Sequence, residues 1–399
     1  MLSQCFQKIV VCTGTCGKTT TTSMLFHVFA HWQPSLVFGG KLKGNNRSGC
    51  VQGWVDLLVL ESDESDGSHR LFQPNIGVIT SCSPDHLEYY GSQESLIESM
   101  VTFACHTKEL LVLGYDDEHI RCLYHHLNQL YHQSQSDHSS VVLPQQMISV
   151  GFHPEADIVI NVLAVTQKGS RFSLELNQDL SKKLGYSHRV LQCFPQEVLL
   201  PVIGRHNIQN ASFAAVSYLL DQKEVTHHQI TEIFHHYPGV HRRLDVVWQR
   251  DNMMVIDDYA HNPEKIKAAI TAVSEAYPDA YLTVVFEPHK ENRVMGRKQA
   301  YYETFHGVNH LVIAPLYEPS SDSHSSQSLS LSYEPKTFGP LIMKFSQVRR
   351  LSYLTDYQQT GRVVFAELSL LQQRHVILVM GAGKSGEATQ NLLSYLSPT

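Results

Sequence analysis

The stretch IVVCTGTCGKTTTT at residues 9–22 decides the fold of this chain. Its apolar start is typical of a buried strand and its threonine-rich end of a helix, with a glycine turn between them. Gly14 and Gly17 allow the backbone to curl so that successive N–H groups point at phosphate oxygens. Lys18 adds a positive charge, and Thr19 offers a hydroxyl group to Mg²⁺. The spacing Gly-x-x-Gly-Lys-Thr is shorter than that of the usual P-loop, and it predicts a chain that binds ATP or a related nucleotide.

The pattern on either side of this turn predicts an α/β fold. Short apolar runs alternate with longer amphipathic stretches, an order typical of a doubly wound parallel sheet. A second alternation begins near Met254, after the Pro238-Gly239 pair. With 399 residues, the chain is too long for one ordinary core. We therefore predict a P-loop-type doubly wound ATP-binding domain at residues 1–238 and a smaller Rossmann-like α/β domain at residues 239–399.

Further segments have patterns of their own. Period-two alternation around Asp157–Val162 and Arg171–Leu176 predicts an antiparallel hairpin at the edge of the first sheet. The serine-rich segment Ser320–Ser332 has no periodicity, which predicts a mobile surface loop. The last expected strand, Val376–Met380, leads through the string GAGKSG at residues 381–386 into a final helix.

The charge and composition of the chain limit the kinds of molecule that it is expected to bind. The net charge is −7, and lysine and arginine are scattered along the chain. We therefore expect small charged ligands as partners, and neither nucleic acid nor membrane. The eight cysteines contain no CxxC pair, which predicts reduced thiols and a cytoplasmic location. The first strand begins too early for a signal peptide, and no apolar run reaches the roughly 18 residues that a membrane span needs.

Acidic and histidine side chains follow two of the expected strands. The run at residues 57–60 leads into ESDESD, so that Glu61 stands at the carboxyl end of a strand, where α/β sheets bind ligands. Four carboxylates within six residues repel one another unless a cation offsets them, which favours Mg²⁺ held by oxygen atoms. A solvated acidic loop is the alternative. The next strand leads to Asp85-His86, a pair that could bind metal or cap a helix.

Four more polar strings carry candidate chemistry, each with an ordinary loop or cap as the alternative. The first opens a helix, where Asn207 or His206 would either cap the helix or recognise an adenine edge. The second places two guanidinium groups at the domain boundary, suited to charge on a transferring phosphoryl group. The other two end strands of the second domain. The strings are GRHNIQN (204–210), GVHRRL (239–244), DDYAHNP (257–263) and FEPHKENR (286–293).

Taken in order, these strings resemble the Mur ligases, ATP-dependent enzymes that add amino acids in peptidoglycan synthesis. The likeness covers nearly the whole chain, and Gly39-Gly40 fits it as well. It implies that ATP phosphorylates a carboxylate, that the amine of an amino acid attacks the acyl phosphate, and that phosphate leaves. The strings are most similar to the alanine-adding branch, in which L-alanine joins the carboxylate of UDP-N-acetylmuramate. Other branches often carry a lysine after the Asp-His pair, and residues 99–102 contain none.

The resemblance also implies roles for individual residues. Lys18 would grip the β and γ phosphates, Thr19 and Glu61 one Mg²⁺, and His86 a second. Asn207 and Asn210 would meet adenine, Arg243 the γ phosphate and Asp258 the ribose. The implied nucleotide-binding set is Gly14, Thr15, Gly17, Lys18, Thr19, Thr20, His206, Asn207, Asn210, Arg243 and Asp258. The implied catalytic set is Lys18, Glu61, His86, Arg243, His261 and His289, and the substrate set is Asp63, Glu64, Ser65, Lys290 and Arg293.

The chain also departs from the family pattern. Family members carry His or Asn where Cys16 stands, Asn where Ser81 stands, and commonly Arg where Lys290 stands. A lysine keeps the charge but loses the planar grip on a carboxylate. Only thirteen residues precede Gly14, where the family has a nucleotide-sugar domain of roughly a hundred residues.

That short start leaves several explanations open. The chain is a truncated one, or a separate polypeptide partner supplies the UDP-binding domain, or the acceptor is not a nucleotide sugar. The alternative functions are accordingly a muropeptide-recycling ligase, a ligase with another acceptor, or a non-catalytic ATP-binding remnant or partner subunit. The presence of Lys18, Thr19, Glu61, His86 and Arg243 argues against the remnant.

Overall fold

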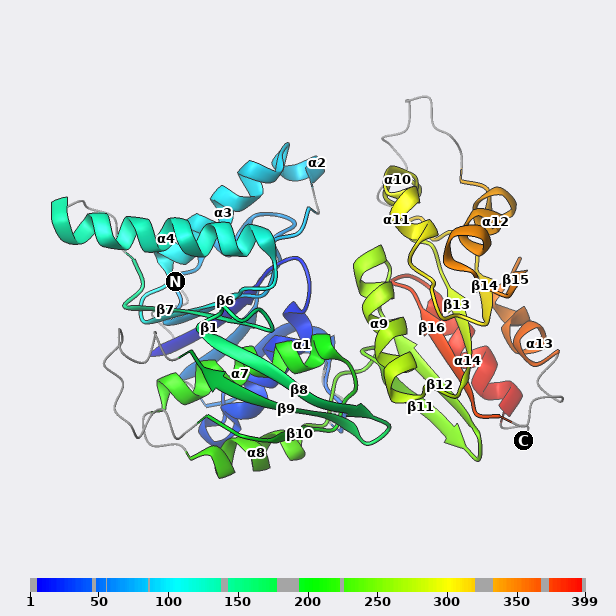
Figure 1. The fold of residues 1–399 in the computed structure, drawn as a ribbon, viewed down its shortest axis with the longest axis horizontal. Coiled ribbons are helices and arrows are strands. Elements are labelled where there is room, and N and C mark those ends of the chain that lie inside the picture. Colours follow the sequence, from blue (N-terminus) through cyan, green and yellow to red (C-terminus); the bar gives the residue numbers. More distant parts are fainter. Residues whose placement is uncertain are drawn as a thin grey trace. The chain divides into compact units, whose positions relative to one another are not determined.

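The chain divides into two compact units, Met1–Val240 and His241–Thr399 (Figure 1). The computed structural model describes residues 6–44, 48–54, 56–84, 87–137, 143–177, 194–222, 226–319, 333–366 and 373–396. The expected surface loop Ser320–Ser332 lies outside these ranges. Across the described ranges, every helix is too short or too polar to cross a membrane.

A ten-stranded sheet forms the centre of the first unit. Its strands are β1 (Lys8–Thr13), β2 (Ser35–Lys41), β3 (Ser48–Val51), β4 (Leu57–Glu61), β5 (Ile76–Ile79), β6 (Leu110–Gly114), β7 (Gln146–Gly151), β8 (Ile158–Thr166), β9 (Gly169–Leu176) and β10 (Val198–Leu200). They lie in the order β10-β9-β8-β7-β6-β5-β1-β4-β2-β3. Pairing is parallel from β8 through to β2 and antiparallel at both edges. The expected doubly wound sheet and the β8–β9 hairpin are both confirmed.

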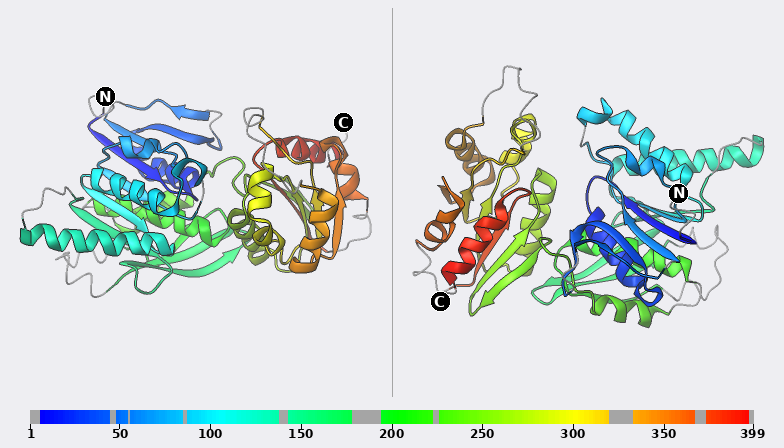
Figure 2. Two further views of the ribbon diagram at one scale, coloured as in Figure 1. Left: turned by 90° about the horizontal axis from the view of Figure 1, so that it is seen from above. Right: turned by 180° about the vertical axis from the view of Figure 1, so that it is seen from behind.

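Helices cover both faces of this sheet. The helical segments are α1 (Lys18–Val28), η2 (Ala30–Trp32), η3 (Ser68–Leu71), α2 (Leu87–Tyr90), α3 (Gln93–His106), α4 (Glu118–Asp137), α7 (Arg205–Asp221) and α8 (His227–His235). Because side chains alternate along a strand, Val10 and Cys12 of β1 pack with α1, α7 and α8, while Ile9 and Val11 pack with α3 and α4. Figures 1 and 2 show these two helical layers. The turn at residues 14–17 therefore emerges from the middle of a buried sheet.

The second unit contains a six-stranded sheet. Its elements are β11 (Asp245–Arg250), β12 (Met253–Asp258), α9 (Pro263–Ala276), β13 (Tyr281–Phe286), α10 (Glu291–Gly296), α11 (Lys298–Tyr302), β14 (His310–Ile313), α12 (Pro335–Ser346), β15 (Arg350–Tyr353), η5 (Tyr357–Gln359), α13 (Thr360–Phe365), β16 (His375–Met380) and α14 (Ser385–Leu396). The order is β11-β12-β16-β13-β14-β15, and only the β11 pairing is antiparallel. Val285 packs with α13 and α14, whereas Phe286 packs with the ring of Tyr301 in α11 on the opposite face. The expected Rossmann-like fold is confirmed.

Some elements differ from the sequence expectation. The expected helix at Lys298–Phe305 ends at Tyr302, and the short helix α10 precedes it. Helix α12 contains Pro340, and a proline inside a segment weakens the helical pattern in the sequence. Edge strand β11 is half exposed, so its hydrophobic pattern is weak. These elements depend on packing against their neighbours more than on local sequence.

Three buried histidines are neutral in the folded protein. Burial lowers the pKa of His69, His310 and His375 to about 4. His375 Nε2 lies 2.8 Å from Thr283 Oγ1, and His310 Nε2 lies 2.9 Å from Ser352 Oγ. Hydroxyl partners stabilise the neutral rings, and burial disfavours the imidazolium form.

We expect the free energy of unfolding to fall as the pH decreases from 6.5 to 4. Each ring has an ordinary pKa of 6.5 in the unfolded chain but resists protonation until about pH 4 in the folded protein. Below pH 6.5 the unfolded state therefore binds more protons, worth on the order of 3 kcal/mol per histidine by pH 4. Urea unfolding at several pH values measures the slope. His375→Gln should flatten it, exposed His228→Gln should not, and equal slopes in all three proteins would contradict the assignment.

Candidate active site at the phosphate-binding turn

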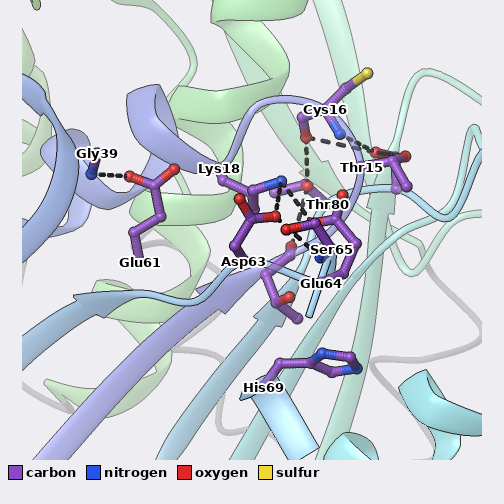
Figure 3. Close-up of polar contacts among 12 residues, drawn as sticks. Thr15, Cys16, Lys18, Gly39, Glu61, Asp63, Glu64, Ser65, His69 and Thr80 are labelled. Carbon is purple, nitrogen blue, oxygen red and sulfur yellow. Dashed lines mark hydrogen bonds and ion pairs between the residues drawn. The ribbon is translucent and has the colours of Figure 1, made fainter. Parts of the chain in front are cut away.

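The turn at residues 14–17 lies between the ends of parallel strands. Strand β1 pairs with β4 on one side and β5 on the other, in a register that places Cys12 beside Glu61 and Thr13 beside Ile79. The carboxyl ends of parallel strands meet at one edge of a sheet. The acidic string after β4 and the hydroxyl-rich string after β5 therefore both reach the turn, as Figure 3 shows.

Glycine is required at two positions of the turn. Gly14 has φ 122° and Gly17 has φ 85°, values that residues with a side chain rarely adopt. A Cβ on Gly14 would lie 2.5 Å from Thr80 Oγ1 and 2.7 Å from the Ser81 carbonyl oxygen. A Cβ on Gly17 would lie 2.5 Å from Asn210 Oδ1. The tight backbone leads directly into α1, so that the N-terminus of this helix faces the turn.

The segment after β5 fixes the turn through hydrogen bonds. Thr15 N donates to Ser81 O over 3.1 Å, and Cys16 N donates to Ser81 Oγ over 2.8 Å. Ser83 N donates to Thr15 Oγ1 over 3.0 Å, and Thr80 Oγ1 donates to Cys16 O over 2.5 Å. Sequence reasoning assigned no role to Thr80, Ser81 or Ser83. The signal that could have found them is the run of hydroxyl residues directly after a strand next to the turn.

Lys18 forms ion pairs with two carboxylates of the acidic string. Its Nζ lies 2.5 Å from Glu64 Oε2 and 3.4 Å from Asp63 Oδ1 (Figure 3). Burial alone would lower the pKa of Lys18, but the two carboxylates raise it above its usual value. Partial burial would raise the pKa of Asp63, but Lys18 and the Ser65 N–H group lower it to about 2. Glu64 is fully buried, so Lys18 is its counter-ion in this structure.

Thr19 and Glu61, the two oxygen donors expected to hold Mg²⁺, are in direct contact. Thr19 Oγ1 donates to Glu61 Oε1 over 2.7 Å, and Gly39 N donates to Glu61 Oε2 over 2.5 Å. Adjacent hydroxyl and carboxylate oxygens at the rim of a phosphate turn fit Mg²⁺, which takes few protein ligands and completes its shell with water and phosphate. In the described part of the chain, no three His, Cys, Asp or Glu side chains gather into a metal site. Asp85 and His86 lie outside that part, so the role of His86 stays a prediction.

Helix α7 begins without a side-chain cap. Gly204, with φ 105°, precedes its first residue, Arg205. The alternative in which His206 or Asn207 caps this helix is wrong, because both residues lie inside it. Asn207 Nδ2 instead donates to Ile203 O over 2.8 Å.

Asn210, the next asparagine of α7, packs against one side of the turn. Asn210 is buried, and its Oδ1 accepts a hydrogen bond from Thr21 Oγ1 over 3.1 Å. The same oxygen leaves no space for a side chain on Gly17. The adenine contacts expected of Asn207 and Asn210 stay predictions.

Two arginines at the start of the second unit lie against one aromatic ring. The guanidinium carbons of Arg242 and Arg243 are each 5.0 Å from the centroid of the Tyr259 ring, within cation–π distance. Arg242 Nη2 also donates to Gly381 O over 2.7 Å and to Ser385 Oγ over 2.8 Å. These contacts fix the direction of Arg242. The γ-phosphate contact expected of Arg243 stays a prediction.

Asp258 accepts hydrogen bonds from backbone N–H groups, one of them in the segment directly after these arginines. Its Oδ2 accepts a hydrogen bond from Leu244 N over 2.7 Å, and its Oδ1 accepts one from Ala260 N over 2.8 Å. Burial raises the pKa of this carboxyl, while Arg243 opposes the shift. The structure shows a structural role for Asp258, and its contact with ribose stays a prediction.

The strings after β12 and β13 bring two histidines together. The ring centroids of His261 and His289 are 5.5 Å apart. Burial, together with the positive charge of Lys265 nearby, lowers the pKa of His261 well below its ordinary value, so the ring is neutral. Lys290 directly precedes α10, and Arg293 lies within that helix. His261, His289, Lys290 and Arg293, which were expected to bind or act on the substrates, therefore all follow the carboxyl ends of β12 and β13.

Comparisons with known proteins match both units. A model described as the Mur ligase middle domain matches residues 12–218, and a model described as the Mur ligase, glutamate ligase domain matches residues 242–383. The chain belongs to the Mur ligase family. Mur ligases are ATP-dependent acid–amino-acid ligases, so the ligase chemistry that the polar strings imply is confirmed at the level of the family.

Relatives of this Mur ligase match it along most of its length. A UDP-N-acetylmuramate–L-alanine ligase of Desulforapulum autotrophicum is 29% identical over 97% of this chain and 76% of the relative. The enzyme of that name from Nitratidesulfovibrio vulgaris is 30% identical over 93% of this chain and 73% of the relative. The crystal structure of a UDP-N-acetylmuramate–alanine ligase from Thermotoga maritima has a TM-score of 0.73 and 22% identity, and it covers 98% of this chain and 76% of that one. This last likeness supports the fold.

Proposed function

We propose that this Mur ligase uses ATP and Mg²⁺ to join L-alanine to the carboxylate of UDP-N-acetylmuramate. The observation that carries the proposal is the match of both units to enzymes of that name over most of this chain. Contacts at the turn support it, because Lys18 pairs with Glu64 and the adjacent Thr19 donates a hydrogen bond to Glu61 at the rim of the turn. A Mur-type structure from Thermotoga maritima was solved with ADP, which supports nucleotide use in this fold.

Each of the site residues would have its own part in the proposed reaction. The γ-phosphoryl group passes to the substrate carboxylate, the amine attacks the resulting acyl phosphate, and inorganic phosphate leaves as the amide forms. Lys18 and the N–H groups of the turn would bind the phosphates, and a bound Mg²⁺ would neutralise charge on the transferring group. Thr19 and Glu61 would hold that ion. In the second unit, neutral His261 and the cations Lys290 and Arg293 would bind and orient the carboxylate acceptor and the amino acid.

Phosphate release from ATP tests the proposal directly. We expect release that requires both UDP-N-acetylmuramate and L-alanine, with other amino acids and other muramoyl carboxylates giving less. Release with a different acceptor would point to the recycling or other-acceptor alternatives. No release with any pair of substrates, from a folded protein that binds ATP, would contradict the proposal.

Replacing Glu61 tests the proposed metal ligand. Glu61→Ala should raise the Mg²⁺ concentration required for half-maximal turnover by about tenfold or more, because one of two protein oxygens is lost. Binding of the nucleotide should change less than turnover. Glu98 on α3 is exposed, and Glu98→Ala is the matched control. Equal Mg²⁺ dependence in Glu61→Ala and wild type would remove Glu61 from the site.

A further inference from the structure

The turn that carries His289 and Lys290 is attached to a second loop by a pair of backbone hydrogen bonds. Tyr317 N donates to Pro288 O over 2.9 Å, and Lys290 N donates to Tyr317 O over 2.9 Å. These two bonds form an isolated parallel bridge between His289 and Tyr317, outside the regular sheet. From these contacts we propose that Tyr317 is a positioning residue, which fixes the direction of His289 and Lys290; the part that concerns substrate rests on the function proposed above.

The backbone at Lys290 shows why such a clamp is needed. Lys290 has φ 60° and ψ 114°, a combination that residues with a side chain rarely adopt. A conformation of this kind persists only where the surrounding structure enforces it, and it is concentrated at functional sites. One of the two bonds to Tyr317 is made by the N–H group of Lys290 itself and the other by the carbonyl oxygen of Pro288, while the Lys290 carbonyl oxygen accepts a bond from Val294 N in α10. Tyr317 therefore holds the chain on the N-terminal side of the strained residue, and without its two bonds the turn would lose its attachment to the second loop.

The side chain of Tyr317 is enclosed between two neighbours. On one side its ring stacks on His289, with centroids 5.4 Å apart and planes 29° apart. On the other side it covers Gly383, where an added Cβ would lie 2.2 Å from Tyr317 Cγ. The ring therefore fits only because residue 383 has no side chain.

Gly383 is itself held in place. Its N–H group donates to Glu287 Oε1 over 2.7 Å, and Glu287 Oε2 accepts a hydrogen bond from Tyr357 Oη over 2.6 Å. Glu287 is buried and directly precedes Pro288. Glu287 thus binds Gly383, Gly383 contacts the Tyr317 ring, and that ring stacks on His289. His289 is two residues after Glu287 in the chain, which closes the cycle of contacts. Because the backbone at Gly383 is fixed, a side chain there would displace the ring of Tyr317.

Hydrogen exchange of the substrate-free protein tests the clamp. Tyr317→Ala and Gly383→Ala should raise the exchange rates of the amides at residues 290 and 317 by about tenfold or more, because the bridge opens locally. Tyr317→Phe keeps the ring and should preserve protection. Gly386→Ala is the matched control, since a Cβ at that position of α14 meets nothing within 4 Å. Unchanged exchange in both Tyr317→Ala and Gly383→Ala, or equal effects of Gly383→Ala and Gly386→Ala, would overturn the proposal.

Steady-state kinetics then connects the clamp to the substrate. Tyr317→Ala and Gly383→Ala should raise the KM for the amino acid by about tenfold and leave the KM for ATP within about twofold, because Lys290, which the clamp orients, belongs to the implied substrate set and not to the implied nucleotide-binding set. Equal changes in both KM values would overturn this positioning role. If wild-type protein releases no phosphate with any substrate pair, the proposed function fails, and the exchange experiment still decides whether the clamp exists.

Discussion

Lys18→Ala should reduce phosphate release by about a thousandfold, because it removes the one cation that the turn offers to the transferring phosphoryl group. The same change should lower the free energy of unfolding by about 3 kcal/mol, since buried Glu64 loses its counter-ion. Glu64 is fully buried, and the Lys18 side chain is only 13% exposed, so solvent cannot replace the pair. A single substitution is thus expected to show two separable effects.

The double variant Lys18→Ala/Glu64→Gln separates them. Removing the buried negative charge should restore part of the lost stability, while turnover stays as low as in Lys18→Ala. Exposed Lys168→Ala is the control and should match wild type in both measurements. Urea unfolding and phosphate release measure the two effects. If Lys18→Ala proved as stable as wild type, the buried ion pair would be wrong; if it kept wild-type turnover, the proposed role of Lys18 would be wrong.

Gly14→Ala should abolish tight nucleotide binding and destabilise the first unit by about 3 kcal/mol. Its Cβ would meet backbone atoms of Ser81, which cannot move away as the end of a flexible side chain can. The φ of 122° adds backbone strain. The expected result is a displaced turn whose N–H groups no longer converge on phosphate.

Gly44→Ala is the matched control for this substitution. Gly44 also has positive φ, 73°, but an added Cβ meets nothing within 4 Å, so we expect a cost of only about 1 kcal/mol. Urea unfolding measures the loss of stability, and a fluorescent ATP analogue measures affinity. Equal losses in the two variants would mean that φ alone, and not the contact with residue 81, makes glycine necessary.

Much of the fold and part of the site follow from the sequence because their cause is local or periodic. The turn was predictable from its glycines, and the place of Glu61 at the same edge of the sheet as the turn was predictable from the rule that parallel strands end at one edge. The adjacency of β4 to β1 was not predictable, because strand order depends on packing of the whole sheet. The structure supplies it and thereby explains why the acidic string reaches the turn.

Other parts of the site depend on contacts that have no local pattern. The ion pair of Lys18 with Glu64 joins residues 46 positions apart, and the stack of Tyr317 on His289 joins two loops. The alternative of a cap at His206 or Asn207 is wrong because Gly204 precedes the helix and Arg205 begins it. Only the roles implied for phosphate, metal and substrate contacts remain predictions, since they require a bound ligand.

The acidic string also has a consequence for the proposed binding of the nucleotide. Two carboxylates, Asp63 and Glu64, pair with the single ammonium group at the turn, and a third, Glu61, accepts a hydrogen bond from the adjacent Thr19. A bare triphosphate approaching this rim meets net repulsion at close range, whereas a triphosphate that already carries a divalent cation does not. If the protein binds ATP as proposed, we therefore expect this rim to favour the metal complex of the nucleotide over the free anion.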